Sequence, residues 1–257
     1  MKVVILCGGL GTRLREETEY KPKPMVEIGG QPILWHIMKL YGHYGFKDFI
    51  LCLGYKHQVI REYFLNYRYM NCDVTVSLAS DHRIVCHNHH DEDWNVTLAY
   101  TGLETKKGGR MKMIAPYLNG ERFMLTYGDG VSDVNIDALI AYHEKEEVLA
   151  TFTGVHPISR FATVERDAAG KIIDWNEKKQ LEGYMNAGFF VLENAVLDYI
   201  EGDVEFEEQP MKRIAKEGKL AMYRHEGFWQ CMDTYRDYLL LTELWEKGQA
   251  PWKVWSD

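Results

Sequence analysis

A glycine-rich turn followed by cations is the first place in this sequence where chemistry could occur. The apolar run Val3-Val4-Ile5 leads into Leu6-Cys7-Gly8-Gly9-Leu10-Gly11-Thr12-Arg13, a pattern typical of a buried parallel strand that ends in a turn. Glycine has no side chain in the way, so such a turn lets backbone N–H groups approach phosphate oxygens. Lys21-Pro22-Lys23-Pro24 follows closely and adds positive charge. The glycines alone would also fit a plain strand-to-loop turn, whereas the cations favour triphosphate binding.

Two carboxylates occur where a metal ion could meet a phosphate. Asp129 lies in Tyr127-Gly128-Asp129-Gly130 at the end of an apolar strand, and its flanking glycines leave room for a ligand. Asp233 precedes a predicted helix. Mg²⁺ prefers one or two carboxylates together with substrate oxygens. Taken singly, Asp129 also fits a Gly-Asp-Gly turn, and Asp233 also fits an N-cap or first-turn acid.

Composition narrows the class of protein. The 257 residues are 46% hydrophobic and 26% charged, which is ordinary for a soluble globular protein with a substantial core. The formal net charge of -8 argues against a general nucleic-acid or anionic-membrane binder, but it permits a small polyanionic substrate in a local positive pocket. We expect no signal peptide and no membrane span. Five scattered cysteines favour free thiols in a reducing cytoplasm: Cys7, Cys52, Cys72, Cys86 and Cys231.

The elements that position these residues alternate between strand and helix in the first half of the chain. Strand patterns cover residues 2–7, 49–53 and 123–126, and helix patterns cover residues 32–44 and 136–147. This alternation predicts a mostly parallel sheet with helices on both faces. Ligands of such sheets bind beyond the carboxyl ends of the strands, where the glycine turn and the Gly-Asp-Gly segment are both expected.

Shorter strands interrupt and follow this pattern. Residues 71–100 alternate as an inserted antiparallel element would, and residues 151–192 contain short strands broken by glycines. Two further helices are predicted around residues 210–218 and 235–247. No internal repeat or low-complexity linker divides the chain, so we predict a single α/β domain over residues 1–257.

Two polar segments have plain interpretations. Cys86-His87-Asn88-His89-His90-Asp91 contains zinc-ligand residue types, but neighbours in a strand point to opposite faces, which favours an exposed or intersubunit segment. Glu205, Glu207 and Glu208 are interpreted as the solvated start of a helix.

Taken in order, the motifs closely resemble those of the sugar-1-phosphate nucleotidylyltransferases over nearly the whole chain. The motifs that carry this resemblance are Gly8 to Arg13, Lys21 to Met25, Gly108 to Arg110, Tyr127 to Gly130, Val164-Glu165, Glu177-Lys178, Asn186 to Gly188 and Met232 to Thr234. The branch of the family that uses CTP and glucose 1-phosphate is indicated by Tyr127 to Gly130, Trp94 to Leu98, Gly227 to Gln230 and Ala250 to Lys253.

The resemblance implies a reaction and roles for its residues. The phosphate of glucose 1-phosphate would attack the α-phosphorus of CTP in line, with Mg²⁺ as cofactor and pyrophosphate as leaving group. Asp129 and Asp233 would hold Mg²⁺. Arg13 would neutralise the charge growing on pyrophosphate, and Lys23 would contact the α-phosphate. The nucleotide-binding residues would be Leu6, Gly8, Gly9, Leu10, Gly11, Thr12, Arg13, Lys23, Thr105, Gly109, Arg110 and Asp129.

The resemblance also implies a sugar-phosphate-binding part over about residues 150–235. Its contacts would be Glu165, Lys178, Asn186 and Gly188. Lys179 stands where the family usually has proline, so either Lys178 or Lys179 could hold the sugar phosphate, and Ala187 replaces an expected glycine. These departures leave the exact sugar open.

Fold, assembly and pathway follow from the same resemblance. It implies a Rossmann-like, mostly parallel sheet flanked by helices, with an antiparallel insertion near residues 71–100 and a β-rich sugar-binding half. Relatives assemble through such insertions, so a cytoplasmic homo-oligomer is expected. The product would lead to dideoxy sugars of surface polysaccharide, including O-antigen and lipopolysaccharide.

Competing classes fit less well. A dinucleotide-binding oxidoreductase would need Gly-x-Gly-x-x-Gly and a helix directly after the turn, and Lys-Pro-Lys-Pro would break such a helix. A non-catalytic nucleotide-sugar-binding regulator would be expected to lack an acidic or basic residue of the site, yet Asp129, Asp233, Arg13 and Lys23 are all present. Another sugar 1-phosphate or another nucleoside triphosphate remains an alternative substrate.

Overall fold

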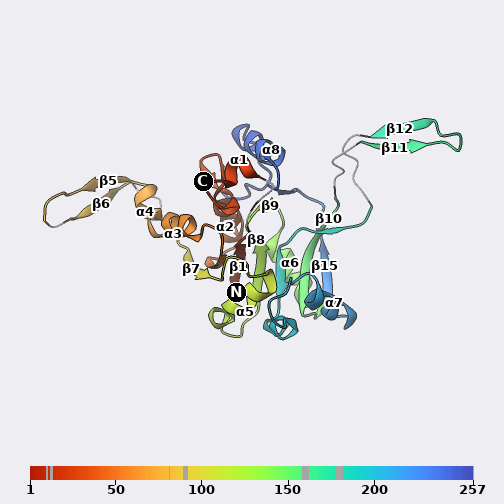
Figure 1. Ribbon diagram of the computed structural model, residues 1–257, viewed down its shortest axis with the longest axis horizontal. Coiled ribbons are helices and arrows are strands. Elements are labelled where there is room, and N and C mark those ends of the chain that lie inside the picture. Colours follow the sequence, from red (N-terminus) through yellow and green to blue (C-terminus); the bar gives the residue numbers. More distant parts are fainter. Residues whose placement is uncertain are drawn as a thin grey trace.

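A large mixed sheet forms the centre of the molecule (Figure 1). The structure is a computed structural model that describes residues 1–9, 11, 14–80, 82–88, 92–157, 162–176 and 182–256. Within this part of the chain the sheet has the strand order β13-β10-β14-β8-β1-β4-β7, and β15 also pairs with β10. The strands are β1 Lys2–Cys7, β4 Asp48–Leu53, β7 Asn95–Tyr100, β8 Phe123–Tyr127, β10 Ala150–Val155, β13 Met185–Asn186, β14 Phe190–Leu192 and β15 Leu220–Arg224.

Strand β1 lies between two parallel neighbours and is covered on both faces. Residues 3–5 are fully buried, so the strand reads as a continuous apolar run rather than an alternating one. It pairs in parallel with β4 on one side and with β8 on the other, which sets Leu6 level with Cys52 and Tyr127. These three strands therefore end at the same edge of the sheet, and the segments that follow them meet there.

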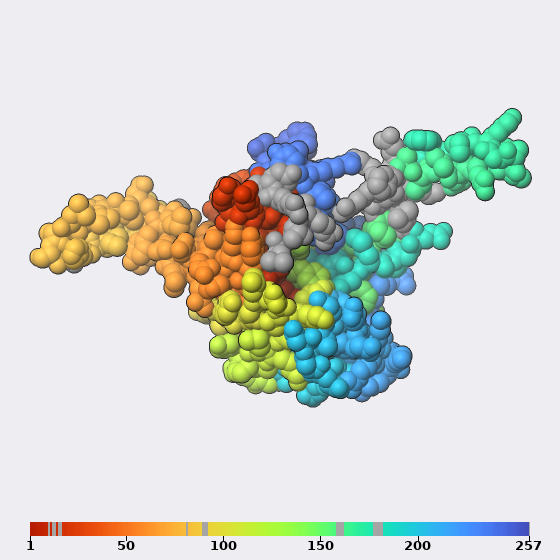
Figure 2. Space-filling view, viewed as in Figure 1, coloured from red at the N-terminus to blue at the C-terminus, as the bar shows by residue number. Residues whose placement is uncertain are grey.

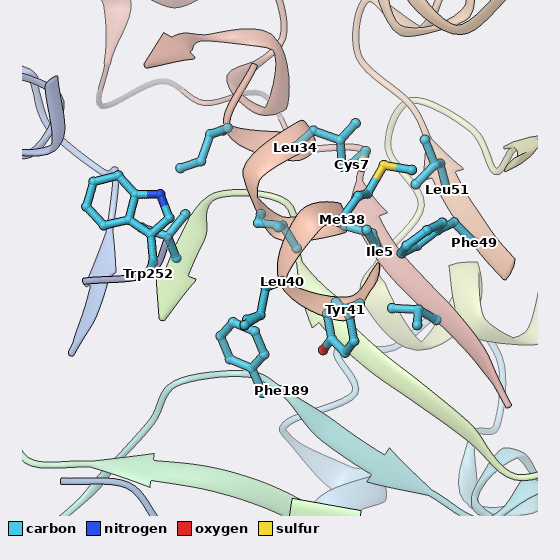
Figure 3. Close-up of a cluster of buried hydrophobic side chains, with 14 of the residues drawn as sticks. Ile5, Cys7, Leu34, Met38, Leu40, Tyr41, Phe49, Leu51, Phe189 and Trp252 are labelled. Atoms are coloured by element: carbon cyan, nitrogen blue, oxygen red, sulfur yellow. The ribbon is translucent and has the colours of Figure 1, made fainter. Parts of the chain in front are cut away.

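Helices cover both faces of the sheet, as the strand–helix alternation predicts. Val3, Ile5 and Cys7 of β1 pack in one core with helix α2, while Val4 packs in a second core with helix α5. Figure 3 shows Leu34 and Met38 of α2 over Ile5 and Phe49 in the first core. The helices of the described residues are α1 Arg15–Thr18, α2 Ile33–His43, α3 His57–Leu65, α4 Tyr67–Met70, α5 Lys107–Leu118, α6 Ile136–Glu146, α7 Gln209–Lys216 and α8 Tyr235–Glu246, with 3-10 helices η1 Lys23–Met25 and η2 Asn194–Tyr199.

The helices expected over residues 32–44, 136–147, 210–218 and 235–247 are confirmed with small shifts at their ends, whereas α1 and α5 are not among the expected elements. Helix α1, of four residues, does follow the glycine turn, but it ends at Thr18, before Lys21-Pro22-Lys23-Pro24. It is therefore much shorter than the helix that follows the glycine turn of a dinucleotide-binding fold.

Two exposed hairpins project from opposite sides of the body (Figures 1 and 2). One pairs β5 Asp73–Val76 with β6 Ile84–His87, and the other pairs β11 Thr163–Arg166 with β12 Ile172–Asn176. Cys86 and His87 lie on the first hairpin, which agrees with the expected exposed segment, whereas His89, His90 and Asp91 lie outside the described residues.

The expected insertion over residues 71–100 is too long. Its last strand, β7, pairs in parallel with β4 and belongs to the central sheet, because its side chains Val96 and Leu98 pack against the core beneath α2 and α3. The antiparallel insertion is confined to β5 and β6. Two small two-stranded sheets complete the fold: β2 Glu27–Ile28 with β3 Gln31–Pro32, and β9 Gly130–Ser132 with β16 Trp229–Cys231.

A buried histidine joins α2 to the C-terminal segment. The His36 ring lies edge-on to Trp245 and Trp252, fully shielded from solvent. Its Nδ1 accepts from the Trp252 indole N–H at 3.3 Å, and its Nε2 lies 2.9 Å from the Ile28 carbonyl oxygen. Neutral imidazole with its proton on Nε2 satisfies both contacts. Burial lowers the pKa of His36 to about 4.

Acid should therefore destabilise the protein through His36. In the unfolded chain His36 has its ordinary pKa of about 6.5, so between pH 6.5 and 4 the unfolded state binds a proton that the folded state does not. The free energy of unfolding should fall over this window, by on the order of 3 kcal/mol in total. Urea denaturation at a series of pH values measures this. His36→Gln should be less stable at pH 7 but show a flatter pH dependence; equal slopes in both proteins would contradict the assignment.

Candidate active site

A cleft of about 730 Å³ opens at the edge where β1 and β8 end. Many of the residues proposed from the sequence line it, and they come from segments far apart in the chain. Those present are Leu6, Gly8, Gly9, Gly11, Lys23, Thr105, Arg110, Asp129, Asn186 and Asp233. The structure thus brings most of the predicted nucleotide site and one predicted sugar contact into a single cleft.

Two carboxylates meet in this cleft because β16 lies beside β9. Asp129 occupies the turn between β8 and β9, and the pairing of Cys231 with Gly130 sets Asp233 next to it. The Met232 N–H donates to the Asp129 carbonyl oxygen at 2.8 Å and holds the two turns together. Trp229 and Cys231 are alternate residues of β16 and both line the cleft, and Asp233, two residues beyond Cys231, lines it as well.

The N-cap of α8 is Thr234, and Asp233 is therefore left to face the cleft. The Thr234 side chain accepts from the Asp237 N–H, and the Asp237 carboxylate accepts from the Thr234 N–H, which forms a capping box. The interpretation of Asp233 as an N-cap is wrong, because its neighbour takes that position.

Lys23 lies between the two carboxylates. Its Nζ is 2.6 Å from Asp129 Oδ2 and 2.5 Å from Asp233 Oδ1, with only 10% of the side chain exposed. Burial opposes the charged ammonium, but the neighbouring Asp129 and the hydrogen bonds to both carboxylates outweigh it, so the pKa of Lys23 is raised. The Gly128 N–H donates to the Leu6 carbonyl oxygen, and a Cβ at Gly128 would lie only 3.0 Å from the Pro24 ring. Close packing of Pro24 on Gly128 thus places Lys23 beside Asp129.

Arg110 fixes the backbone around the glycine turn. Its side chain rises from the first turn of α5 and is buried, and its guanidinium donates to segments that follow β1, β4 and β7. The acceptors are the carbonyl oxygens of Leu53, Gly102, Gly8 and Leu103 and the hydroxyl of Thr101, at 2.7 to 3.3 Å. This network gives Arg110 a positioning role that the sequence reasoning missed; its contact with a nucleotide stays a prediction.

Glu207 belongs to the cleft and not to a solvated helix start. Its Oε1 accepts from the Tyr127 hydroxyl at 2.5 Å and from Lys107 Nζ at 2.6 Å, and Asn186 Nδ2 donates to the same tyrosine hydroxyl at 3.0 Å. Helix α7 begins only at Gln209. A signal was available in the sequence: the aromatic Phe206 stands between Glu205 and Glu207, which is unusual for a fully solvated helix start, and Phe206 is buried.

The predicted sugar contacts are only partly assembled. Asn186 lines the cleft, and its Oδ1 accepts from the Gly188 N–H at 2.9 Å, which positions the amide; Gly188 itself has φ of +83°. Ala187 is buried and does not line the cleft, and its carbonyl oxygen accepts from the Trp229 indole N–H at 2.9 Å. The β11–β12 hairpin projects from the body (Figure 1). Glu165 lies on this hairpin and does not line the cleft.

Other predicted residues have different positions or are not described. Gly109, in the first turn of α5, packs against Asp203 and does not line the cleft. Leu10, Thr12, Arg13, Lys178 and Lys179 lie outside the described residues.

The donor set of the cleft fits a hard divalent cation. Ligand atoms of Asp129, Cys231 and Asp233 lie within 4.8 Å of one another, and the Lys23 ammonium stands between the two carboxylates as a cation would. Carboxylate oxygens are the ligands that Mg²⁺ prefers, whereas the thiol suits softer metals.

Comparison with known proteins defines the class. The chain matches the nucleotidyl transferase family over residues 2–257 and belongs to that family. It is 51% identical over 259 residues to the glucose-1-phosphate cytidylyltransferase of Salmonella typhi, covering 100% of both chains. It is 44% identical over 257 residues to the probable glucose-1-phosphate cytidylyltransferase of Bacillus subtilis, covering 99% of this chain and 100% of the relative. The resemblance drawn from the motifs is thereby confirmed.

Solved structures share the fold at much lower identity. HddC from Yersinia pseudotuberculosis superposes with a TM-score of 0.68 at 22% identity, over 95% of this chain and 99% of that one. A putative glucose-1-phosphate thymidylyltransferase from Bacillus anthracis also gives 0.68, at 16% identity, over 100% and 98%. These matches confirm the predicted α/β fold class. Among the helices of the described residues, none combines the length and the apolar character needed to cross a bilayer.

The contact between the glycine turn and Arg110 predicts opposite outcomes at two adjacent glycines. A Cβ at Gly8 would lie 2.2 Å from the Arg110 guanidinium carbon, whereas one at Gly9 would meet nothing within 4 Å. Gly8→Ala should lower the free energy of unfolding by about 2 kcal/mol through overpacking. Gly9→Ala should leave it within about 0.5 kcal/mol of the wild type. Guanidinium denaturation compares the free energies of unfolding of the two variants. An equal decrease in both would contradict the close packing of the Arg110 guanidinium on Gly8.

Proposed function

We propose that this nucleotidyltransferase transfers the cytidylyl group of CTP to α-D-glucose 1-phosphate, giving CDP-glucose and pyrophosphate. The observation that carries the proposal is the 51% identity to the Salmonella typhi enzyme over the full length of both chains. The cleft supports it, because a glycine turn, a lysine and two carboxylates lie together at the carboxyl edge of the parallel core strands of the sheet.

The reaction asks for alignment and charge neutralisation rather than covalent catalysis. A phosphate oxygen of the sugar phosphate would form the new P–O bond at the α-phosphorus as the bond to the bridging oxygen of pyrophosphate breaks. Backbone N–H groups of the glycine turn are suited to the phosphates, and Lys23 to the α-phosphate. Asp129 and Asp233 would hold Mg²⁺, which supplies charge stabilisation on the phosphate oxygens. Arg13 would neutralise the leaving pyrophosphate.

Sugar recognition is proposed at the side of the cleft formed by Asn186, Tyr127 and Glu207. Their connected hydrogen bonds place an amide, a phenol and a carboxylate next to one another, which suits sugar hydroxyls. Lys178 or Lys179 would hold the sugar phosphate, with Gly188 as a further contact. Ala187 is buried and does not line the cleft, so its replacement of glycine does not change the described lining.

Base recognition is proposed near the N-terminus of α5, where Thr105 and Arg110 line the cleft. Sites that hydrogen-bond a base edge can discriminate strongly, because a mismatched base leaves buried polar groups unpaired. The alternatives are the same reaction with another triphosphate or another sugar phosphate, and a non-catalytic regulator. Activity measurements distinguish among them.

A homo-oligomer in the cytoplasm is also proposed. Both projecting hairpins expose apolar side chains that a monomer would leave in water, among them Val76, Ile84, Ile173 and Trp175. Cys7, Cys52, Cys86 and Cys231 are free thiols, as a reducing compartment favours.

Pyrophosphate release should identify the substrates. With Mg²⁺ and a matrix of four triphosphates against several sugar 1-phosphates, release should be highest with CTP and glucose 1-phosphate.

Activity should depend on both carboxylates. Asp129→Asn and Asp233→Asn should each lower kcat by on the order of 10²–10³-fold, by analogy with the loss of preorganised charge stabilisation, while the circular dichroism spectrum stays unchanged.

The matched control is Asp93→Asn, an exposed acid paired with Lys47 away from the cleft, which should keep full activity. No pyrophosphate from any combination would refute the enzyme proposal. Full activity of both cleft variants would instead refute the metal assignment.

The first hairpin should mediate assembly. Val76 and Ile84 are paired across β5 and β6, so their side chains share one face. Val76→Lys with Ile84→Lys should lower the mass measured by light scattering after gel filtration without a change in Tm. Thr75→Lys, at the neighbouring position on the opposite face, is the control. An unchanged mass in the double variant would argue against a contact through this face.

A further inference from the structure

The cation that lies between the two carboxylates is part of the protein itself. Lys23 Nζ contacts one oxygen of each acid, Asp129 Oδ2 and Asp233 Oδ1, at 2.6 and 2.5 Å. The side chains of the three residues are 10%, 27% and 13% exposed, so water screens the contact poorly. Lys23 thus neutralises half of the charge of the pair.

The backbone of Lys23 is held in place, so any movement must come from its side chain. Pro22 and Pro24 restrict φ on either side, and Lys23 begins the 3-10 helix η1. The Met25 N–H donates to the Pro22 carbonyl oxygen and the Val26 N–H to the Lys23 carbonyl oxygen, at 2.8 and 3.1 Å. The flexible four-carbon stem is therefore the part that can redirect the ammonium.

A divalent cation and the ammonium compete for the same oxygens. Mg²⁺ or Mn²⁺ binds carboxylate oxygens at about 2.1 Å, so an ion bridging the two contacted oxygens would occupy the space of Lys23 Nζ. If the metal ion and the Lys23 ammonium both stayed between the carboxylates, three positive charges would face two negative ones in a poorly screened site. We propose that Lys23 occupies the metal position in the nucleotide-free protein and excludes the metal ion until the ammonium has another anion to bind.

The glycine turn lies within reach of the redirected ammonium. A Cβ at Gly11 would lie 3.3 Å from Lys23 Cβ, so the lysine stem starts beside the turn. Under the proposed function, triphosphate oxygens bound there would take over the ammonium and free both carboxylates. Metal and triphosphate would then enter together, and the nucleotide-free protein would bind metal weakly. Only the identity of this second anion rests on the proposed function.

Binding of Mn²⁺ to the protein without nucleotide tests the competition. Isothermal titration calorimetry and Mn²⁺ electron paramagnetic resonance would compare the wild type with Lys23→Met, which keeps the length of the side chain and removes its charge. We expect Lys23→Met to bind Mn²⁺ at least about 10-fold more tightly. Lys23→Arg keeps the charge and should bind as weakly as the wild type. Lys21→Met, at a half-buried lysine paired with Glu27, is the matched control and should also match the wild type.

Thermal unfolding provides a second readout and a check on folding. Lys23→Met should have a lower Tm than the wild type in EDTA, because its two carboxylates repel, and Mn²⁺ should raise its Tm more than that of the wild type. If Lys23→Met does not fold, Lys23→Gln takes its place with the same expectations. Equal Mn²⁺ affinity in the wild type and the neutral variant, or weaker affinity in the variant, would overturn the proposal. Since no nucleotide or sugar is present, these results are independent of whether cytidylyl transfer is the reaction.

Discussion

The parallel pairing of β1 with both β4 and β8 is the constraint on which the rest of the structure depends. A strand buried on both faces can shift its register only by moving every apolar side chain into the wrong core. That register fixes where the glycine turn begins and where Asp129 leaves the sheet. Arg110 then ties the ends of three parallel strands together through their carbonyl oxygens, so the edge that carries the site behaves as one unit.

Charge is distributed unevenly in this acidic protein. With a formal net charge of -8, the surface offers no general attraction for polyanions. Phosphate binding must therefore come from oriented backbone dipoles and a few placed cations. The same cleft also holds several acids, and in the described contacts two acids share each lysine: Asp129 and Asp233 contact Lys23, and Glu205 and Glu207 contact Lys107. Such sharing makes the site sensitive to any change of a single charge.

Local patterns were enough to predict much of the fold and part of the site. The continuous apolar run of β1, the proline-started α2 and the two carboxylate motifs were predicted because each depends on neighbouring residues. The pairing of β7 was mistaken since an alternating strand of six residues fits an antiparallel hairpin or the edge of a parallel sheet equally well. Glu207 and the positioning role of Arg110 were missed because Tyr127 and Gly8, the partners concerned, lie 80 and 102 residues away, a separation that no local pattern reports. The N-cap at Thr234 was recognisable from Asp237 three residues later, but the neighbouring acid was considered in its place.

The stack of Trp252 on Phe228 makes one carboxylate depend on a segment that never touches the cleft. Phe228 stacks on Trp252 at a centroid distance of 5.6 Å, and it directly precedes β16, the strand that leads to Asp233. The segment around Trp252 does not line the cleft, so its damage would disturb the position of Asp233 and leave the glycine turn in place.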